Sequence, residues 1–305
     1  MVYEKKIPVT VITGFLGAGK TTFINQVLKS NPEINFALVE NEFGEVAIDA
    51  QLIKGVDASQ MFELKQGCIC CTISDEYELV LIELAERFPD VGHLLIETTG
   101  IADPVTVIQP FFRDKNVKAN YRYIGTVCLV DALNFNLQYE REITRKQLVI
   151  SDLIVLNKTE DFTENQKNEL KIEIRQINPW AKISVTSYGR IPDFQLNNIQ
   201  QKLRPESTDF SIKSAHTHLQ SKTLYFEYPL AKEVFIRWLS YTLDINKNKV
   251  YRVKGMLCFQ DELYESIVQG VGGSFELQEG GLIQEQKSGS LVFIGKDLDG
   301  LDLSF

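Results

Sequence analysis

Several features that would assign this chain to other classes of protein are missing from its sequence. Nowhere do the roughly 18 apolar residues that a membrane-spanning helix requires follow one another. The 32 Lys and Arg residues form no block, and 41 Asp and Glu residues give a formal net charge of −9. Because nucleic-acid backbones are bound through clustered positive charge, neither a nucleic acid nor a membrane is expected as a partner.

Cysteine is scarce and unevenly distributed. The chain has five cysteines, and three of them lie within four residues at Cys68, Cys70 and Cys71. An odd number with such clustering does not fit the disulfide framework of a secreted protein, and it favours a reducing, cytoplasmic compartment. There is also no internal repeat, so 305 residues with 44% hydrophobic content indicate a globular protein with room for two domains.

Short apolar stretches alternate with helical patterns over the first two hundred residues. Strands are predicted at residues 9–13, 36–39, 93–96, 125–130, 153–156 and 183–185. Helices are predicted at 21–29 and at 73–88, where apolar residues (Ile73, Tyr77, Leu81, Leu84 and Phe88) recur every three or four positions. This alternation is typical of an α/β fold with a mainly parallel sheet covered by helices on both faces, where ligands bind at the carboxyl ends of the strands.

The pattern changes after a polar stretch. We predict a first domain at residues 1–204, a linker at 205–222 and a smaller α+β domain at 223–305. The inner face of the one helix predicted in the second domain carries Val234, Phe235, Trp238 and Leu239. Strands are predicted near residues 250–259, 263–268, 273–277 and 291–294.

A phosphate-binding loop follows the first predicted strand. Residues 14–21, GFLGAGKT, match the pattern G-x-x-x-x-G-K-[ST] between a strand and a helix, so the first domain is predicted to be a P-loop NTPase domain. Main-chain N–H groups cradle the phosphates in such loops, Lys20 reaches the β- and γ-phosphates, and the Thr21 hydroxyl binds Mg²⁺. The predicted nucleotide contacts are Gly14, Gly17, Ala18, Gly19, Lys20, Thr21 and Thr22.

Two further motifs follow predicted strands. In Glu97-Thr98-Thr99-Gly100, the Glu97 carboxylate is placed to hold the Mg²⁺ shell, and Gly100 to present its N–H to a γ-phosphate. Residues 157–160, NKTE, resemble the guanine-reading element N-K-x-D, with Asn157 on the base, the Lys158 stem over the ring and Glu160 in place of Asp. Glu160 keeps the carboxylate of the usual Asp on a side chain that is one methylene longer. GTP is therefore the predicted nucleotide, with relaxed base specificity as an alternative.

The cysteine cluster predicts a metal site. In an extended chain Cys68 and Cys70 lie on one side and Cys71 on the other. Thiolates select zinc, copper(I) or iron–sulfur chemistry and can hold cobalt, and an open fourth position suits a carrier. The acidic stretch 40–46, with Glu42, could add a hard carboxylate ligand. His216 and His218 could both face one ion if the linker is extended, whereas Cys128 and Cys258 are assigned to packing.

Taken together, these residues resemble the CobW-type metallochaperone GTPases, a branch of P-loop GTPases with nickel-insertion proteins as distant relatives. The resemblance rests on GFLGAGKTT, ENEFGEVAID, GCICC, ETTGIADP and NKTE, and on the carboxy-terminal part of the chain. It implies GTP hydrolysis coupled to delivery of zinc or cobalt to a client protein. It also implies phosphate and Mg²⁺ roles for the loop, Glu97 and Gly100, a base-reading role for residues 157–160, and metal binding by the three clustered cysteines and Glu42.

Two alternatives remain open at this point. One is an ATP-using small-molecule kinase in which the cysteines are incidental, and the other is a metal sensor or buffer that binds nucleotide without turnover. The sequence has no histidine-rich tract for metal storage, and no evident arginine finger or water-orienting glutamine, so hydrolysis is expected to be slow.

Overall fold

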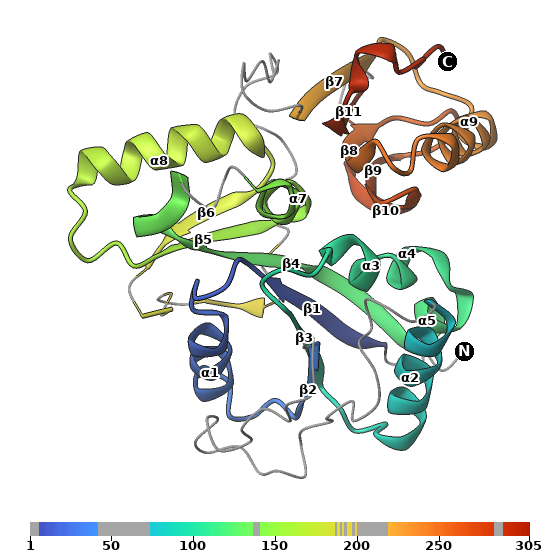
Figure 1. Cartoon of the computed structure of the whole chain (residues 1–305). Helices are drawn as coiled ribbons and strands as arrows, with labels where there is room; N and C mark the ends of the chain where they lie inside the picture. Colours follow the sequence, from blue (N-terminus) through green and yellow to red (C-terminus); the bar gives the residue numbers. More distant parts are fainter. Residues whose placement is uncertain are drawn as a thin grey trace. The chain divides into compact units, whose positions relative to one another are not determined.

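A computed structural model describes residues 6–41, 74–136, 141–186, 219–283 and 289–305, together with 188–189, 191, 194–196 and 199. The chain divides into a larger amino-terminal unit and a smaller carboxy-terminal unit. Figure 1 labels the helices and strands of both. No helix in these ranges is long and apolar enough to cross a membrane.

The larger unit is built on one parallel sheet of six strands. Its elements are β1 (Ile7–Thr13), α1 (Lys20–Ser30), β2 (Phe36–Asn41), α2 (Ser74–Arg87), β3 (His93–Thr98), α3 (Pro104–Ile108), α4 (Pro110–Arg113), α5 (Lys115–Asn120), β4 (Tyr121–Asp131), the 3₁₀ turn η2 (Ala132–Asn134), α7 (Glu142–Ile150), β5 (Leu153–Asn157), α8 (Glu164–Ile177) and β6 (Lys182–Val185). The strand order is β2-β3-β1-β4-β5-β6, and every neighbouring pair is parallel. The predicted parallel sheet of a P-loop NTPase is thereby confirmed.

Helices cover both faces of this sheet. The crossover through α1 leads from β1 toward β2, whereas all later crossovers run in the opposite direction toward β6. Since crossovers between parallel strands are right-handed, α1 lies on one face, and α2, α3, α7 and α8 lie on the other. Burial on both faces explains why the strands read as continuous apolar runs in the sequence.

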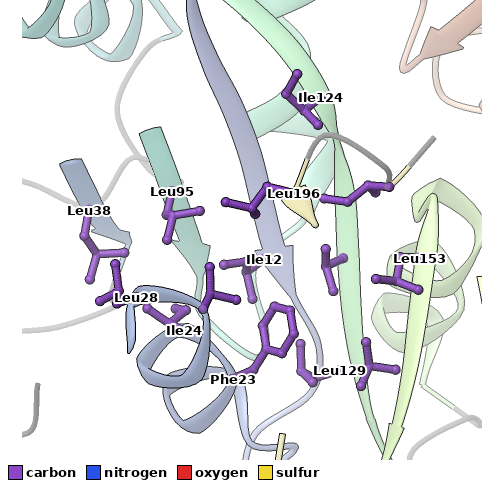
Figure 2. Packing of buried hydrophobic residues seen from close by; sticks show 14 of the residues in the cluster. Ile12, Phe23, Ile24, Leu28, Leu38, Leu95, Ile124, Leu129, Leu153 and Leu196 are labelled. Carbon is purple, nitrogen blue, oxygen red and sulfur yellow. The ribbon is translucent and has the colours of Figure 1, made fainter. Parts of the chain in front are cut away.

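The core beneath α1 is a single packed cluster. Figure 2 shows Phe23, Ile24 and Leu28 of α1 directed at the sheet. The sheet supplies Ile12, Leu38, Leu95, Leu129 and Leu153 to this cluster, and Leu196 closes it from the segment after β6. This packing fixes the first turn of α1, and with it the phosphate loop, against the end of β1.

Some predicted boundaries in this unit need correction. β4 begins at Tyr121 rather than at Gly125, because the glycine lies inside the strand with a φ of 150° and does not start it. Phe88 lies beyond the end of α2 and is 39% exposed, so the apolar face of that helix ends with Leu84.

The smaller unit is a five-stranded antiparallel sheet with one long helix. Its elements are β7 (Leu219–Phe226), α9 (Lys232–Ile245), β8 (Val250–Leu257), β9 (Tyr264–Val271), β10 (Ser274–Leu282), β11 (Gly289–Lys296) and the 3₁₀ turn η4 (Leu298–Gly300). The strand order is β10-β9-β8-β11-β7. Phe235, Leu239 and Leu243 of α9 pack into the core of this unit, which confirms the predicted α+β class.

Two expectations about this unit were wrong. Val234 is 47% exposed, because it lies one position off the stripe that Phe235 and Leu239 bury. β7 begins at Leu219, so the last four residues of the expected linker (219–222) belong to the sheet, where they pair with β11.

Candidate nucleotide-binding site

Each nucleotide motif lies just beyond the carboxyl end of a neighbouring strand. β1 ends before the phosphate loop, the Glu97 motif spans the end of β3, and Asp131 and Asn157 end β4 and β5. Because these four strands are adjacent and parallel, their motifs meet at one edge of the sheet. β1 is also the point at which the chain changes direction across the sheet, which is where ligands bind in open α/β folds.

The phosphate loop is closed by its own lysine. Lys20 is buried, and its Nζ donates to the carbonyl oxygen of Gly14, 3.1 Å away. α1 begins at Lys20 after Gly19, which has a left-handed φ of 99°, and no side chain caps this end of the helix. An uncapped helix start leaves backbone N–H groups free to bind an anion such as a phosphate.

Two oxygen ligands lie beside this loop. The Thr21 hydroxyl at the start of α1 is 3.5 Å from Oε1 of Glu97. Glu97 is brought here by the parallel pairing of β1 with β3, which places it opposite Ile12. A hydroxyl and a carboxylate are the hard ligands that Mg²⁺ prefers, so the residues present fit that ion.

The loop after β3 packs tightly on the phosphate loop. A Cβ at Gly100 would lie 2.4 Å from the backbone nitrogen of Leu16, so only glycine fits there. From the other side, α7 holds the same loop, with Nε2 of Gln147 donating to the Gly100 carbonyl oxygen at 3.2 Å and Lys146 Nζ 2.8 Å from Asp103 Oδ2. Gln147 and Lys146 were not predicted from the sequence, where a helical position facing a loop carries no signal.

Asn157 connects the base-reading element to the phosphate loop. Its Nδ2 donates to the Ala18 carbonyl oxygen at 3.0 Å, and its Oδ1 accepts from the Gly189 N–H at 3.2 Å. A Cβ on Gly19 would lie 2.4 Å from the Asn157 Nδ2, so this contact also requires a glycine in the loop. Gly189, which follows β6, is a site residue that no sequence pattern indicated.

The next residue, Lys158, has a positive φ of 60°, and its Nζ lies 2.8 Å from Oδ2 of Asp131. Burial alone would raise the pKa of Asp131, but hydrogen bonds from Lys158 and Asn134 outweigh it and hold that pKa below its usual value. Asp131 was not among the predicted site residues, although an acid directly after a buried strand was a visible signal. Glu160 is exposed in the turn that follows β5.

The predicted metal ligands lie outside the described residues. These are Glu42, Cys68, Cys70 and Cys71, and the same holds for His216 and His218. Within the ranges that are described, no three His, Cys, Asp or Glu side chains gather as a metal site. Cys128 and Cys258 are buried, and burial raises the pKa of Cys128 to about 12, which confirms their assignment to packing.

Comparison with known proteins assigns the chain to a family. Residues 8–185 match the family described as CobW/HypB/UreG, nucleotide-binding domain, and residues 219–304 match the cobalamin synthesis protein cobW C-terminal domain. The chain belongs to the CobW/HypB/UreG family. The family resemblance expected from the motifs is confirmed, and the two matched segments correspond to the parallel and antiparallel sheets.

Individual CobW-family proteins are similar over nearly the whole chain. The zinc chaperone YjiA of Escherichia coli is 33% identical over 96% of this chain and 95% of its own length. The zinc chaperone CobW of Pseudomonas aeruginosa is 29% identical over 96% of this chain and 88% of its own length. The crystal structure of the Zn(II)-bound YjiA GTPase from E. coli superposes with a TM-score of 0.70 at 27% identity, covering 97% of this chain and 96% of that one.

Proposed function

We propose that this protein is a GTP-hydrolysing metallochaperone that carries zinc, or cobalt, to a client metalloprotein under nucleotide control. The observation that carries the proposal is the direct bond from Asn157, the first residue of the guanine-reading element, to the phosphate loop at Ala18. The similarity to zinc chaperones along the whole chain supports it. Clustered thiols persist only where they stay reduced, so we place the protein in the cytoplasm.

The phosphates are held by the loop of residues 14–22. Lys20 moves from the Gly14 carbonyl oxygen to the β- and γ-phosphates, and the backbone N–H groups at the start of α1 face the same anions. Thr21 and Glu97, whose oxygens lie 3.5 Å apart, would hold Mg²⁺. That ion would supply positive charge to neutralise the β- and γ-phosphates during hydrolysis.

Recognition of the γ-phosphate falls to Gly100. Its position against Leu16 brings its backbone close to the phosphate loop, where the N–H can meet a third phosphate. Loss of that phosphate on hydrolysis releases the loop of residues 97–103, as in other nucleotide switches. Turnover without a partner is slow, since the motifs supply no arginine finger in the catalytic position.

The guanine base lies between the ends of β4 and β5 in this proposal. Asn157 meets the base, the Lys158 stem covers the ring, and the Glu160 carboxylate accepts hydrogen bonds from the guanine N1 and N2 groups. The ion pair with Asp131 fixes the direction of the Lys158 side chain.

The cargo is held by thiolates of Cys68, Cys70 and Cys71, with Glu42 as a further ligand. All four lie outside the described residues, and the support for them is the chemistry of the ligand set. Thiolates bind Zn²⁺ strongly, and the Glu42 carboxylate, as the fourth ligand, is the one that a donor group of the client can replace when the ion is passed on.

A turnover assay tests this function. Phosphate release is measured with GTP and with ATP, each with and without Zn²⁺, on the reduced protein. Slow hydrolysis of GTP with a strong preference over ATP is expected. A parallel Zn²⁺ titration of the GDP and GTP-analogue forms should give different Zn²⁺ affinities. Preference for ATP would indicate the kinase alternative, and nucleotide binding with no turnover would indicate a sensor or buffer.

A further inference from the structure

Three buried polar atoms with unused hydrogen-bonding capacity belong to the loop of residues 97–103 and to α7, which contact each other at Gly100 and Gln147. Gln147 on α7 is 0% exposed, and its Nε2 donates to the Gly100 carbonyl oxygen. Its Oε1 has no hydrogen-bond partner among the described residues, and neither have the buried hydroxyl oxygens of Thr99 and Thr144. A buried amide that is only half paired is rare in native proteins, and it calls for an explanation.

These side chains flank the contact between Gly100 and Gln147, with Thr99 on the loop and Thr144 and Gln147 on α7. Thr99 directly precedes Gly100 on the loop, whereas Thr144 precedes Gln147 by three residues, and so by about one turn, on α7. Gly100 is confined between Leu16 of the phosphate loop and Gln147. Any displacement of Gly100 therefore changes which atoms Gln147 can reach.

We propose that Gln147 is a positioning residue for the γ-phosphate, acting through Gly100, and that the Thr99 hydroxyl donates to Gln147 Oε1 in the GTP-bound arrangement. This inference rests on the proposed function, in which the Gly100 N–H meets the γ-phosphate. That N–H belongs to the peptide between Thr99 and Gly100, so drawing it to the phosphate moves Thr99 relative to α7. The new hydrogen bond satisfies two atoms that are otherwise unpaired.

Such a bond discriminates between nucleotides. GDP lacks the phosphate that moves the Thr99–Gly100 peptide, so the hydrogen bond between Thr99 and Gln147 does not form and does not increase the affinity for GDP. A ligand shifts a conformational equilibrium only by its differential affinity for the two states, and the Thr99–Gln147 bond supplies part of that difference. Thr144 contributes no such difference, because it lies on the same helix as Gln147 and the two keep one separation in both states.

The test is a double-mutant cycle on nucleotide selectivity. Thr99→Val, Gln147→Leu and the double variant are compared with the unmodified protein in calorimetric titrations with GDP and with a non-hydrolysable GTP analogue. Each single variant is expected to lower the affinity ratio of analogue to GDP about tenfold, which corresponds to ~1.4 kcal/mol. The double variant should lose no more than Gln147→Leu alone, since Gln147→Leu already removes the bond that Thr99→Val removes.

Two further readouts exclude a merely structural effect. GDP affinity and the melting temperature without nucleotide should be unchanged in Thr99→Val, while kcat/KM for GTP falls by about the same tenfold factor, mainly through a higher KM. Thr144→Val is the matched control, because it makes the same substitution at a buried hydroxyl that is also unpaired within the described part of the chain, and its affinity ratio should not change.

Three results would overturn the inference: equal losses for GDP and the analogue, additive effects in the double variant, or a loss in Thr144→Val as large as that in Thr99→Val. Thr99→Val breaks no hydrogen bond seen among the described residues, so it remains decisive where Gln147→Leu fails to fold. Failure of the unmodified protein to bind guanine nucleotides would contradict the proposed function itself, which keeps the two ideas separate.

Discussion

The side-chain amide of Asn157 donates from Nδ2 to the carbonyl oxygen of Ala18, 3.0 Å away. The end of β5 is thereby bonded to the centre of the phosphate loop. The same side chain accepts from the Gly189 N–H, so one buried residue joins three segments that are far apart in the sequence. Mutations at this position should therefore affect folding and nucleotide binding together.

Asn157→Ala tests this relationship. The substitution leaves the Ala18 carbonyl and the Gly189 N–H without their partner, and each unsatisfied buried group costs about 1–3 kcal/mol. We expect the free energy of unfolding in urea to fall by about 2–6 kcal/mol for the two groups together and GTP affinity to fall at least about tenfold. The control is Asn168→Ala on the exposed side of α8, where a change within roughly 0.5 kcal/mol is expected. Unchanged stability and affinity in Asn157→Ala would contradict the role assigned here.

Glu160 provides a test of base selectivity. Because it keeps a carboxylate at the position that meets guanine, GTP should bind more tightly than ATP. Glu160→Ala removes one charged acceptor, worth about 1.5–3 kcal/mol, so the gap between the two affinities should narrow by roughly one to two decades. Glu160→Asp, with the same charge, should preserve most of the preference. Equal affinity of the unmodified protein for GTP and ATP would show that residues 157–160 do not read the base.

The ion pair between Lys158 and Asp131 should contribute to stability, because Asp131 is buried. Lys158→Met keeps the aliphatic stem and removes the charge, and a loss of about 1.5–3 kcal/mol at pH 7 is expected. The pKa of Asp131 is lowered in the folded state, so its contribution is present above the unfolded pKa of about 4 and is lost as the pH falls. The difference between variant and unmodified protein should therefore shrink toward pH 3.

A matched pair on the surface serves as the control for this experiment. Lys167 and Glu164 are 2.9 Å apart on α8, at nearly the same distance as Lys158 and Asp131, but the Glu164 side chain is largely exposed. Exposed pairs contribute about 0–1 kcal/mol, so Lys167→Met should change the unfolding free energy little. Equal losses of unfolding free energy in the two lysine variants would mean that burial of Asp131 does not strengthen its ion pair with Lys158.

The buried His93 should make the free energy of unfolding depend on pH. It is 2% exposed in β3, its Nε2 lies 2.9 Å from the Thr10 hydroxyl, and burial together with repulsion from Arg122 lowers its pKa to about 4. The unfolded state binds the proton more readily, so stability should be complete above about pH 6.5 and should decline as the pH falls toward 4, by roughly 3 kcal/mol in total.

Removing the titrating ring tests this expectation. His93→Gln retains a hydrogen-bonding partner for Thr10 and does not titrate, so the slope of the unfolding free energy between pH 4 and 6.5 should flatten. Urea unfolding across this range measures the slope. A variant with the slope of the unmodified protein would show that other groups cause it.

Zinc binding by the cysteine cluster should respond to pH and to nucleotide. Thiolate binding releases protons, so zinc affinity should rise with pH through the range in which Cys68, Cys70 and Cys71 ionise. Affinities for zinc in the GTP-analogue and GDP forms should differ by about 5- to 150-fold, and zinc should change relative nucleotide affinity by the same factor. Replacing Cys70 and Cys71 by Ser should abolish this coupling while nucleotide binding persists. Identical zinc affinities in both nucleotide states would rule out the proposed coupling.

The elements that the sequence predicted well are those with local signals. The loop of residues 14–21 is recognisable from its own residue types, and the buried strands read as apolar runs because helices cover both faces of the sheet. The helix at α1 begins and ends within one residue of its predicted bounds for the same reason. In each case neighbours in the chain determine the structure.

The residues that were missed depend on contacts between distant segments. Gly189 and Gln147 have ordinary local surroundings, and their importance comes from Asn157 and Gly100, which lie 32 and 47 residues away along the chain. Val234 was placed on the wrong face because an apolar residue type does not state which neighbour covers it. Site residues of this kind become visible only when the strands are assembled in order.

The bonds of Asn157 also bear on how fast a nucleotide can enter and leave. Since the hydrogen bonds that join Ala18, Asn157 and Gly189 form within the chain itself, this wall of the site is organised by folding. Each side chain that must be ordered on binding costs about 0.5–1.5 kcal/mol, and that penalty is absent here. Association on this side should therefore need no rearrangement, and a factor that accelerates nucleotide exchange would have to part Asn157 from the phosphate loop.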